Sequence, residues 1–125
     1  MGREKEYKIK SLLIKLIEND EAVILKWSGE STDREPGIFL GPIFEEAVKA
    51  CLAGENKKEL ILDFTSLEYM NSSTITPIVK EIKRAIKTQS PFSIRYDKNL
   101  KWQELSFSAL SVFELEWEKI RIFGI

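Results

Sequence analysis

Apolar and polar residues alternate along this chain in two different rhythms, which predict short strands and amphipathic helices. Residues 59–64 are nearly continuously apolar, as in a buried strand. Residues 75–86 repeat apolar side chains at spacings of three and four, which is typical of a helix with one buried face. The same patterns predict strands at residues 7–17, 22–27, 91–96 and 117–123, and helices at residues 41–52 and 101–112.

The predicted element order is β-β-α-β-α-β-α-β. A polar turn at residues 18–21 makes the first two strands a hairpin, and a break in phase at residues 11–13 indicates a bulge or an offset start. Strands and helices then alternate, which implies parallel strands joined by crossover helices. The sequence therefore predicts an α/β fold with one mixed sheet, in a single domain over residues 1–125. Residues 28–40 are expected to form a long loop.

Four small polar residues separate the central strand from the next helix: Asn71, Ser72, Ser73 and Thr74. Pro77 fits only the first turn of that helix, because a proline farther inside costs about 3 kcal/mol. We therefore expect Ser73 or Thr74 to cap the helix and Ser72 to lie just outside it, facing solvent. Unpaired N–H groups and the positive end of the helix dipole favour an anion or a phosphorylated hydroxyl here.

The composition narrows the possible chemistry. The chain has no histidine, which excludes Ser-His-Asp and Cys-His catalysis and zinc sites with histidine ligands. Its single cysteine, Cys51, cannot form an internal disulfide, and its place on an apolar helix face predicts a core residue. A net charge of -1 gives no attraction to nucleic acid or membrane, and no apolar run approaches the roughly 20 residues of a membrane span. We expect a cytoplasmic, non-enzymatic binding module without metal or cofactor.

The element order and the helix start together resemble the STAS domain of bacterial anti-sigma factor antagonists and of sulphate transporter tails. In that family a strand leads, through a short link, to Asp-Ser-Ser-Gly, an apolar residue and Gly at a helix start. Here these positions hold Asn71, Ser72, Ser73, Thr74, Ile75 and Thr76. The resemblance covers nearly the whole chain in element order, but only about residues 60–85 in sequence.

The resemblance implies a regulator that binds a protein partner: a Ser/Thr kinase-type anti-sigma factor, or a related switch kinase and phosphatase. By position, Ser72 is the implied phosphorylation site, and Ser73, in the place of the second serine, is the second candidate. Asn71 stands in place of the usual Asp and so removes the negative charge beside the acceptor hydroxyl. With Asn at this position, the segment resembles a divergent STAS-like subgroup. Thr74 and Thr76 replace glycines, which restricts close approach of a partner. The implied partner-binding surface consists of Asn71, Ser72, Ser73, Thr74 and Thr76.

Two alternatives stay open. The same helix start would suit a sensor that binds a small ligand, a nucleotide or another anion. Ser, Thr and Asn are also ordinary capping residues, so the cluster could serve folding alone. The apolar run at residues 107–113 is expected to cover the sheet, and any exposed part could form a contact between two copies. The chain is therefore expected to be a monomer or a weak homodimer.

Overall fold

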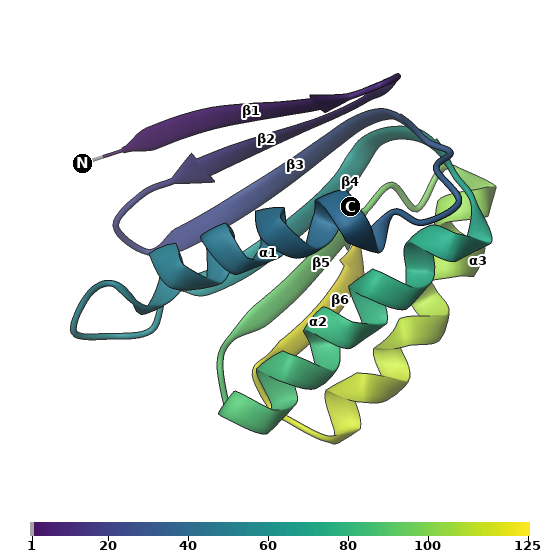
Figure 1. Cartoon of the computed structure of the whole chain (residues 1–125). Coiled ribbons are helices and arrows are strands. Elements are labelled where there is room, and N and C mark those ends of the chain that lie inside the picture. Colours follow the sequence, from purple (N-terminus) through teal and green to yellow (C-terminus); the bar gives the residue numbers. More distant parts are fainter. Residues whose placement is uncertain (1) are drawn as a thin grey trace.

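The fold is built on one twisted sheet, seen in a computed structural model that describes residues 2–125 (Figure 1). Within these residues the strands are β1 Arg3–Ile9, β2 Leu12–Glu18, β3 Ala22–Ser31, β4 Glu59–Met70, β5 Phe92–Tyr96 and β6 Ile120–Gly124. They lie in the sheet in chain order. β1, β2 and β3 pair antiparallel, whereas β3, β4, β5 and β6 pair parallel. The predicted α/β fold with a mixed sheet is confirmed.

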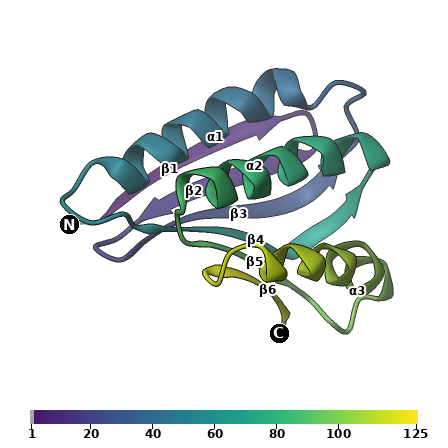
Figure 2. The ribbon, with the colours of Figure 1, turned by 90° about the horizontal axis from the view of Figure 1, so that it is seen from below.

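Three α-helices connect the parallel strands and all lie on one face of the sheet (Figure 2). They are α1 Gly37–Leu52, α2 Ile75–Thr88 and α3 Lys101–Ser108. A 3-10 turn, η1 Ser72–Thr74, precedes α2, and a 3-10 helix, η2 Ala109–Leu115, continues α3. Crossovers between parallel strands are right-handed, and each one here moves one strand farther in the same direction. All helices therefore cover the same face, and the opposite face carries no helix among residues 2–125.

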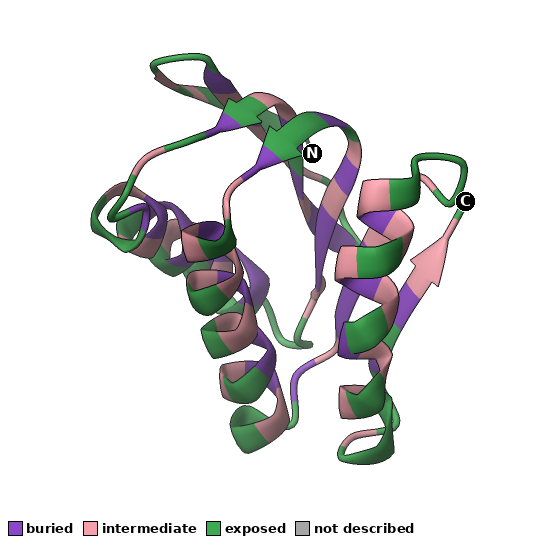
Figure 3. Ribbon diagram, turned by 90° about the vertical axis from the view of Figure 1, so that its right-hand side faces the viewer, coloured by how far each residue is buried: buried purple, intermediate pink, exposed green. Residues whose placement is uncertain are grey.

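The hydrophobic core lies between the sheet and the helices. The buried residues gather on the strands and on the sides of the helices that face them (Figure 3). Trp27 of β3 is fully buried, with its ring centroid 4.8 Å from that of Phe64 and 6.3 Å from that of Phe44. Phe64 stacks on Phe107 of α3 at 4.5 Å. Burying each such side chain contributes roughly 1.5–3 kcal/mol. Cys51 also lies in this core, as predicted.

The prediction for the N-terminal region is wrong in one respect, because residues 7–17 contain parts of two strands. The break in phase marks a tight turn between β1 and β2, in which Lys10 has a φ of 56°. β1 is an edge strand that directs only Tyr7 and Ile9 towards the core, so its charged residues hide the strand pattern. Charged edge strands resist pairing with other chains. The observed order is β-β-β-α-β-α-β-α-β.

The predicted long loop is also shorter, because β3 extends to Ser31 and α1 begins at Gly37 rather than at residue 41. Pro42 consequently lies in the second turn of α1, where its missing N–H removes one helical hydrogen bond. The first turn forms because Leu40 is completely buried, and its N–H donates to the Pro36 carbonyl at 2.8 Å. Burial of this leucine offsets the cost of the proline.

The apolar pattern of the third helix predicts that Trp102, Leu105 and Leu110 point inward. This prediction is wrong for Leu105 alone, because Leu110 is buried and Trp102 packs against the core. Leu105 is exposed, whereas Gln103 and Phe107 are buried. Gln103 turns inward because its side-chain amide donates to the carbonyls of Phe64 (2.6 Å) and Leu67 (2.9 Å). α3 ends at Ser108 rather than at residue 112, and the last strand begins at Ile120 rather than at residue 117.

Candidate functional site

The candidate site lies where β4 runs past its neighbour β5. β4 pairs with β5 only as far as Asp63, but with β3 as far as Met70, which lies opposite Ser31. The Asn71 N–H then donates to the Ser31 carbonyl at 2.9 Å. The chain turns into η1 and α2 at this point, so Ser72 lies beyond the carboxyl ends of two parallel strands. Ligand and partner sites of open α/β sheets commonly occur at this end.

Asn71 holds the turn in place through three side-chain hydrogen bonds. Its Oδ1 accepts from the Thr74 N–H at 3.1 Å and from the Thr74 hydroxyl at 2.7 Å. Its Nδ2 donates to the carbonyl of Asp33 at 2.7 Å, which ties the turn to the loop between β3 and α1. Thr74 is the N-cap residue of α2, as predicted, but its side chain makes no capping hydrogen bond. Asn71 supplies the side-chain cap because a 3-10 turn precedes α2.

Thr74 supports the site from inside the fold. Its side chain is 0% exposed and lies 2.7 Å from the Ser31 hydroxyl, oxygen to oxygen, in a residue only 1% exposed. The Thr74 hydroxyl donates to Asn71, so the Ser31 hydroxyl must donate to Thr74. The expectation that Thr74 lies on the partner-binding surface and restricts approach there is wrong, because its side chain points away from solvent.

Ser31 and Asp33 were missed in the sequence. Ser31 meets Thr74 across a separation of 43 residues, and the Asp33 carbonyl meets Asn71 across 38 residues. The parallel register of β3 and β4 creates both contacts. The one local signal was a small polar residue at the end of the β3 pattern, and this signal is too common to identify a site.

The other predicted residues face the surface. Ser72 and Thr76 are exposed, and Asn71 and Ser73 are half-buried. Within residues 2–125, the hydroxyls of Ser72, Ser73 and Thr76 have no hydrogen-bond partner. Ser72 is thus an accessible hydroxyl on a turn whose backbone is fixed by Asn71.

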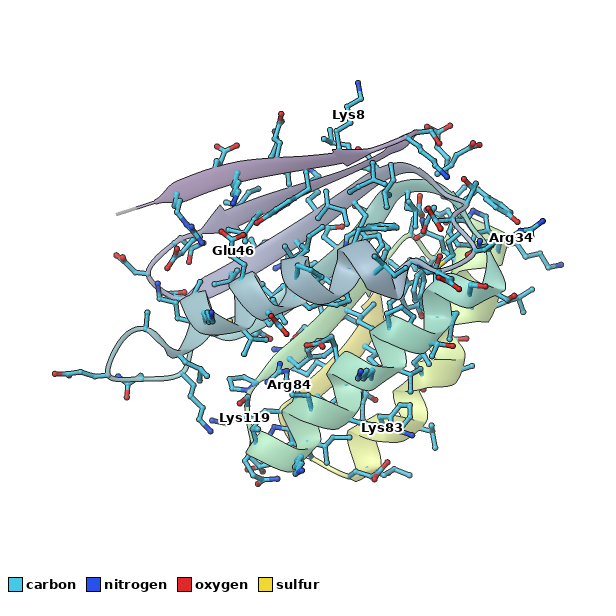
Figure 4. All side chains as sticks on the ribbon, viewed as in Figure 1. Lys8, Arg34, Glu46, Lys83, Arg84 and Lys119 are labelled. Atoms are coloured by element: carbon cyan, nitrogen blue, oxygen red, sulfur yellow. The ribbon has the colours of Figure 1, made fainter. Side chains whose placement is uncertain are left out.

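A groove of about 390 Å³ opens beside this turn, lined by Arg34, Glu35, Pro36, Gly37, Ser73, Thr76, Pro77 and Lys80. Figure 4 places Arg34 in the loop next to the start of α2. Neither Arg34 nor Lys80 forms an ion pair within the part of the chain that the structure describes. Two cations and one carboxylate, Glu35, therefore surround the groove, and the cations are free to meet an anionic group.

The loop that carries Arg34 is fixed by Asp33. The Asp33 carboxylate accepts from the Glu35 N–H at 3.0 Å and from the Lys10 ammonium at 3.4 Å. The backbone hydrogen bond from Glu35, and then the contacts with Lys10, hold the pKa of Asp33 below its usual range. Through its carbonyl, which accepts from Asn71, and its carboxylate, which accepts from Lys10, Asp33 ties the loop both to the turn and to the end of β1.

The geometry favours binding at this site. Within residues 2–125, no three His, Cys, Asp or Glu side chains are placed to hold a metal ion. Burial raises the pKa of the Cys51 thiol to about 11, so it is protonated at neutral pH and lies in the core. The surface presents hydroxyls and cations around an open groove, an arrangement that can contact a partner or carry a phosphate.

Comparison with protein-family models and with curated proteins gives no match. Among solved structures, the crystal structure of an anti-sigma factor antagonist from Mycobacterium paratuberculosis is similar, with a TM-score of 0.63 and 15% sequence identity. The similarity covers 82% of this chain and 81% of that chain. At this identity it shows the fold alone: the chain has the architecture of an anti-sigma factor antagonist, a STAS-like fold, as its element order predicted.

Within residues 2–125, no helix is both long and apolar enough to span a membrane.

Proposed function

We propose that this protein is a non-enzymatic, cytoplasmic signalling regulator of the anti-sigma factor antagonist type. It binds a protein partner through Asn71, Ser72, Ser73 and Thr76, and phosphorylation of Ser72 switches this binding. The observation that carries the proposal is the exposed, unpartnered Ser72 hydroxyl on a turn locked by Asn71. The STAS-like fold, which this chain shares with the crystal structure of an anti-sigma factor antagonist, supports the same class.

A phosphate on Ser72 changes binding without unfolding the domain. It adds about -1.5 to -2 charges and three strong acceptors. The turn tolerates it, because Ser72 is exposed and the start of α2 favours negative charge. A partner packed over the same turn would bury this charge, which is strongly unfavourable without a compensating cation. The partner is a Ser/Thr kinase-type anti-sigma factor or a related switch kinase, with a phosphatase that restores the free hydroxyl.

Phosphate mapping tests the proposal. The protein is incubated with ATP and a Ser/Thr kinase-type anti-sigma factor, and the modified residue is located by mass spectrometry. We expect one phosphate on Ser72 and none on Ser72→Ala protein. Ser73→Ala is the matched control, because Ser73 is adjacent to Ser72 but half-buried at the groove. We expect Ser73→Ala protein to accept the phosphate as wild type does. Modification confined to residues outside the turn would exclude the proposed switch.

A second candidate function follows from the groove itself. The free cations of Arg34 and Lys80 favour a sensor that binds a nucleotide or a small anion between the loop and α2. Isothermal titration calorimetry with nucleotides and inorganic phosphate tests this function. Micromolar binding that Arg34→Ala abolishes would support the sensor, and absence of heat at millimolar ligand would exclude it.

A further inference from the structure

The outer side of α3 and η2 carries an apolar stripe that nothing covers among residues 2–125. Leu105 is 66% exposed, Val112 59% and Leu115 87%, although all three are large and apolar. The stripe consists of Leu105, Ala109, Val112 and Leu115, whose spacing of four, three and three places them on one side of the helical segment. From Leu105 to Leu115 the stripe is about 18 Å long. An exposed row of large apolar side chains is a candidate contact surface.

The end of the stripe is acidic. Glu114, Glu116 and Glu118 follow one another at alternate positions around the end of η2. Glu114 accepts a hydrogen bond from the Ile122 N–H, but Glu116 and Glu118 are exposed and have no ion-pair partner in residues 2–125. The surface that covers the stripe should therefore be partly apolar and positively charged.

α2 of a second copy has these properties. Lys80, Lys83 and Lys87 form no ion pair within the described chain, whereas Arg84 pairs with Glu81 at 3.0 Å. An open groove of about 360 Å³ beside these lysines is lined by Ile75, Thr76, Val79, Lys80 and Lys83. Figure 4 shows Lys83 on the side of α2 that faces η2. α2 and α3 lie on the same face of the sheet, so both surfaces are available to one second molecule (Figure 2).

We propose that two copies of this chain form a two-fold homodimer in which the apolar stripe of each packs on α2 of the other. α2 and α3 each connect parallel strands, so the two helices run in the same direction. A two-fold axis parallel to the helices, between α2 and α3, stacks α3 and η2 of one copy on α2 of its partner. It brings Glu116 of one copy near Lys83 and Lys87 of the other, and symmetry repeats the contact.

The size of the surface predicts a weak dimer. A stripe about 18 Å long and about 10 Å wide, with the matching strip on α2, buries about 360 Å² on each copy. The total of about 700 Å² is smaller than most specific interfaces bury. Association should therefore be weak and depend strongly on protein concentration. It should weaken as salt rises, because the lysine–glutamate contacts are at the rim.

Sedimentation equilibrium at low salt tests the dimer. We expect Leu105→Glu to weaken association at least tenfold, and an exposed side chain can be replaced without loss of the fold. Lys83→Glu and Glu116→Lys should each weaken self-association, whereas an equimolar mixture of these two variants should form a dimer again. In the mixture each reversed charge meets the opposite reversed charge. Lys8→Glu is the matched control, because Lys8 lies on exposed β1, far from α2 and α3 (Figure 4).

Three results would overturn the inference. The first is a wild-type protein that stays monomeric at millimolar concentration. The second is a dimer that persists unchanged in Leu105→Glu and Lys83→Glu proteins. The third is a dimer that Lys8→Glu breaks, which would place the interface on the opposite side of the molecule. Recovery in the mixture shows that each single variant is folded, so misfolding cannot imitate the expected result.

Discussion

Replacing Asn71 with aspartate tests how the turn is held. Asparagine and aspartate have nearly the same shape, so the change removes one donor and adds one charge. In Asn71→Asp protein the carbonyl of Asp33 loses the N–H that lies 2.7 Å away, and a carboxylate oxygen faces it instead. Losing the hydrogen bond and leaving a part-buried carbonyl unpaired costs about 1–3 kcal/mol.

One effect opposes this loss. The carboxylate still accepts from the N–H and hydroxyl of Thr74, and a negative charge at a helix start gains about 0.3–1 kcal/mol. We therefore expect Asn71→Asp to lower the free energy of unfolding by about 1–2 kcal/mol at neutral pH. For a chain of this length the melting temperature should fall by about 4–8 °C.

Urea unfolding followed by tryptophan fluorescence measures the change, because Trp27 is fully buried. The midpoint should fall with an unchanged slope, since the surface exposed on unfolding is the same. Asn56→Asp, at an exposed position between α1 and β4, is the control and should have little effect. If Asn71→Asp matches or exceeds the wild-type stability, the bond to the Asp33 carbonyl does not hold the turn.

Three further substitutions probe other parts of the account. Tyr7→Phe removes the hydroxyl that donates to Glu46 and should cost about 1 kcal/mol, read as faster amide exchange in β1. Burial, and then Glu46, raises the pKa of Tyr7 to about 12. The contribution of this hydroxyl to the free energy of unfolding is therefore complete below pH 10 and is lost as the pH rises through 12. If Tyr7→Phe protein loses as much stability between pH 10 and pH 12 as the wild type does, this explanation is wrong. Gln103→Leu leaves two buried carbonyls unpaired and should cost about 2–4 kcal/mol in urea unfolding; an unchanged midpoint would refute it. Thr74→Val keeps the shape but loses two hydrogen bonds and should cost about 1–3 kcal/mol. A partner should bind folded Thr74→Val protein as tightly as it binds the wild type. A large loss of affinity would show that Thr74 is part of the binding surface.

Local patterns were enough to predict the features around α2. The apolar spacing of Ile78 and Ile82 determines which face is buried, and Pro77 restricts where the helix can begin. Both signals act within one or two helical turns, so the sequence predicted the exposure of Ser72 correctly. Thr74 was correctly predicted as an N-cap position, but the side-chain hydrogen bond from Asn71 was missed, because Asn71 caps a 3-10 turn that precedes α2.

Features that depend on the register between strands could not be predicted. The contacts of Ser31 and Asp33 with the turn exist only because β3 and β4 pair in parallel as far as Met70. Gln103 is likewise buried although it is polar, because β4 extends beyond its pairing with β5 and leaves backbone carbonyls that need a hydrogen-bond donor. A single sequence contains no local signal for a partner that lies about 40 residues away in the chain.

The central claim is that a charge at residue 72 controls partner binding. Calorimetric titration of the kinase-type partner with wild-type, Ser72→Ala and Ser72→Asp protein tests it most directly. Ser66→Asp is the control, since Ser66 is exposed on β4 away from the turn. We expect Ser72→Ala and Ser66→Asp to bind as wild type does. Ser72→Asp should bind at least 30-fold more weakly, because burying an unpaired charge at an interface costs about 2 kcal/mol or more. Equal affinity of the Ser72→Asp and wild-type proteins would contradict the account.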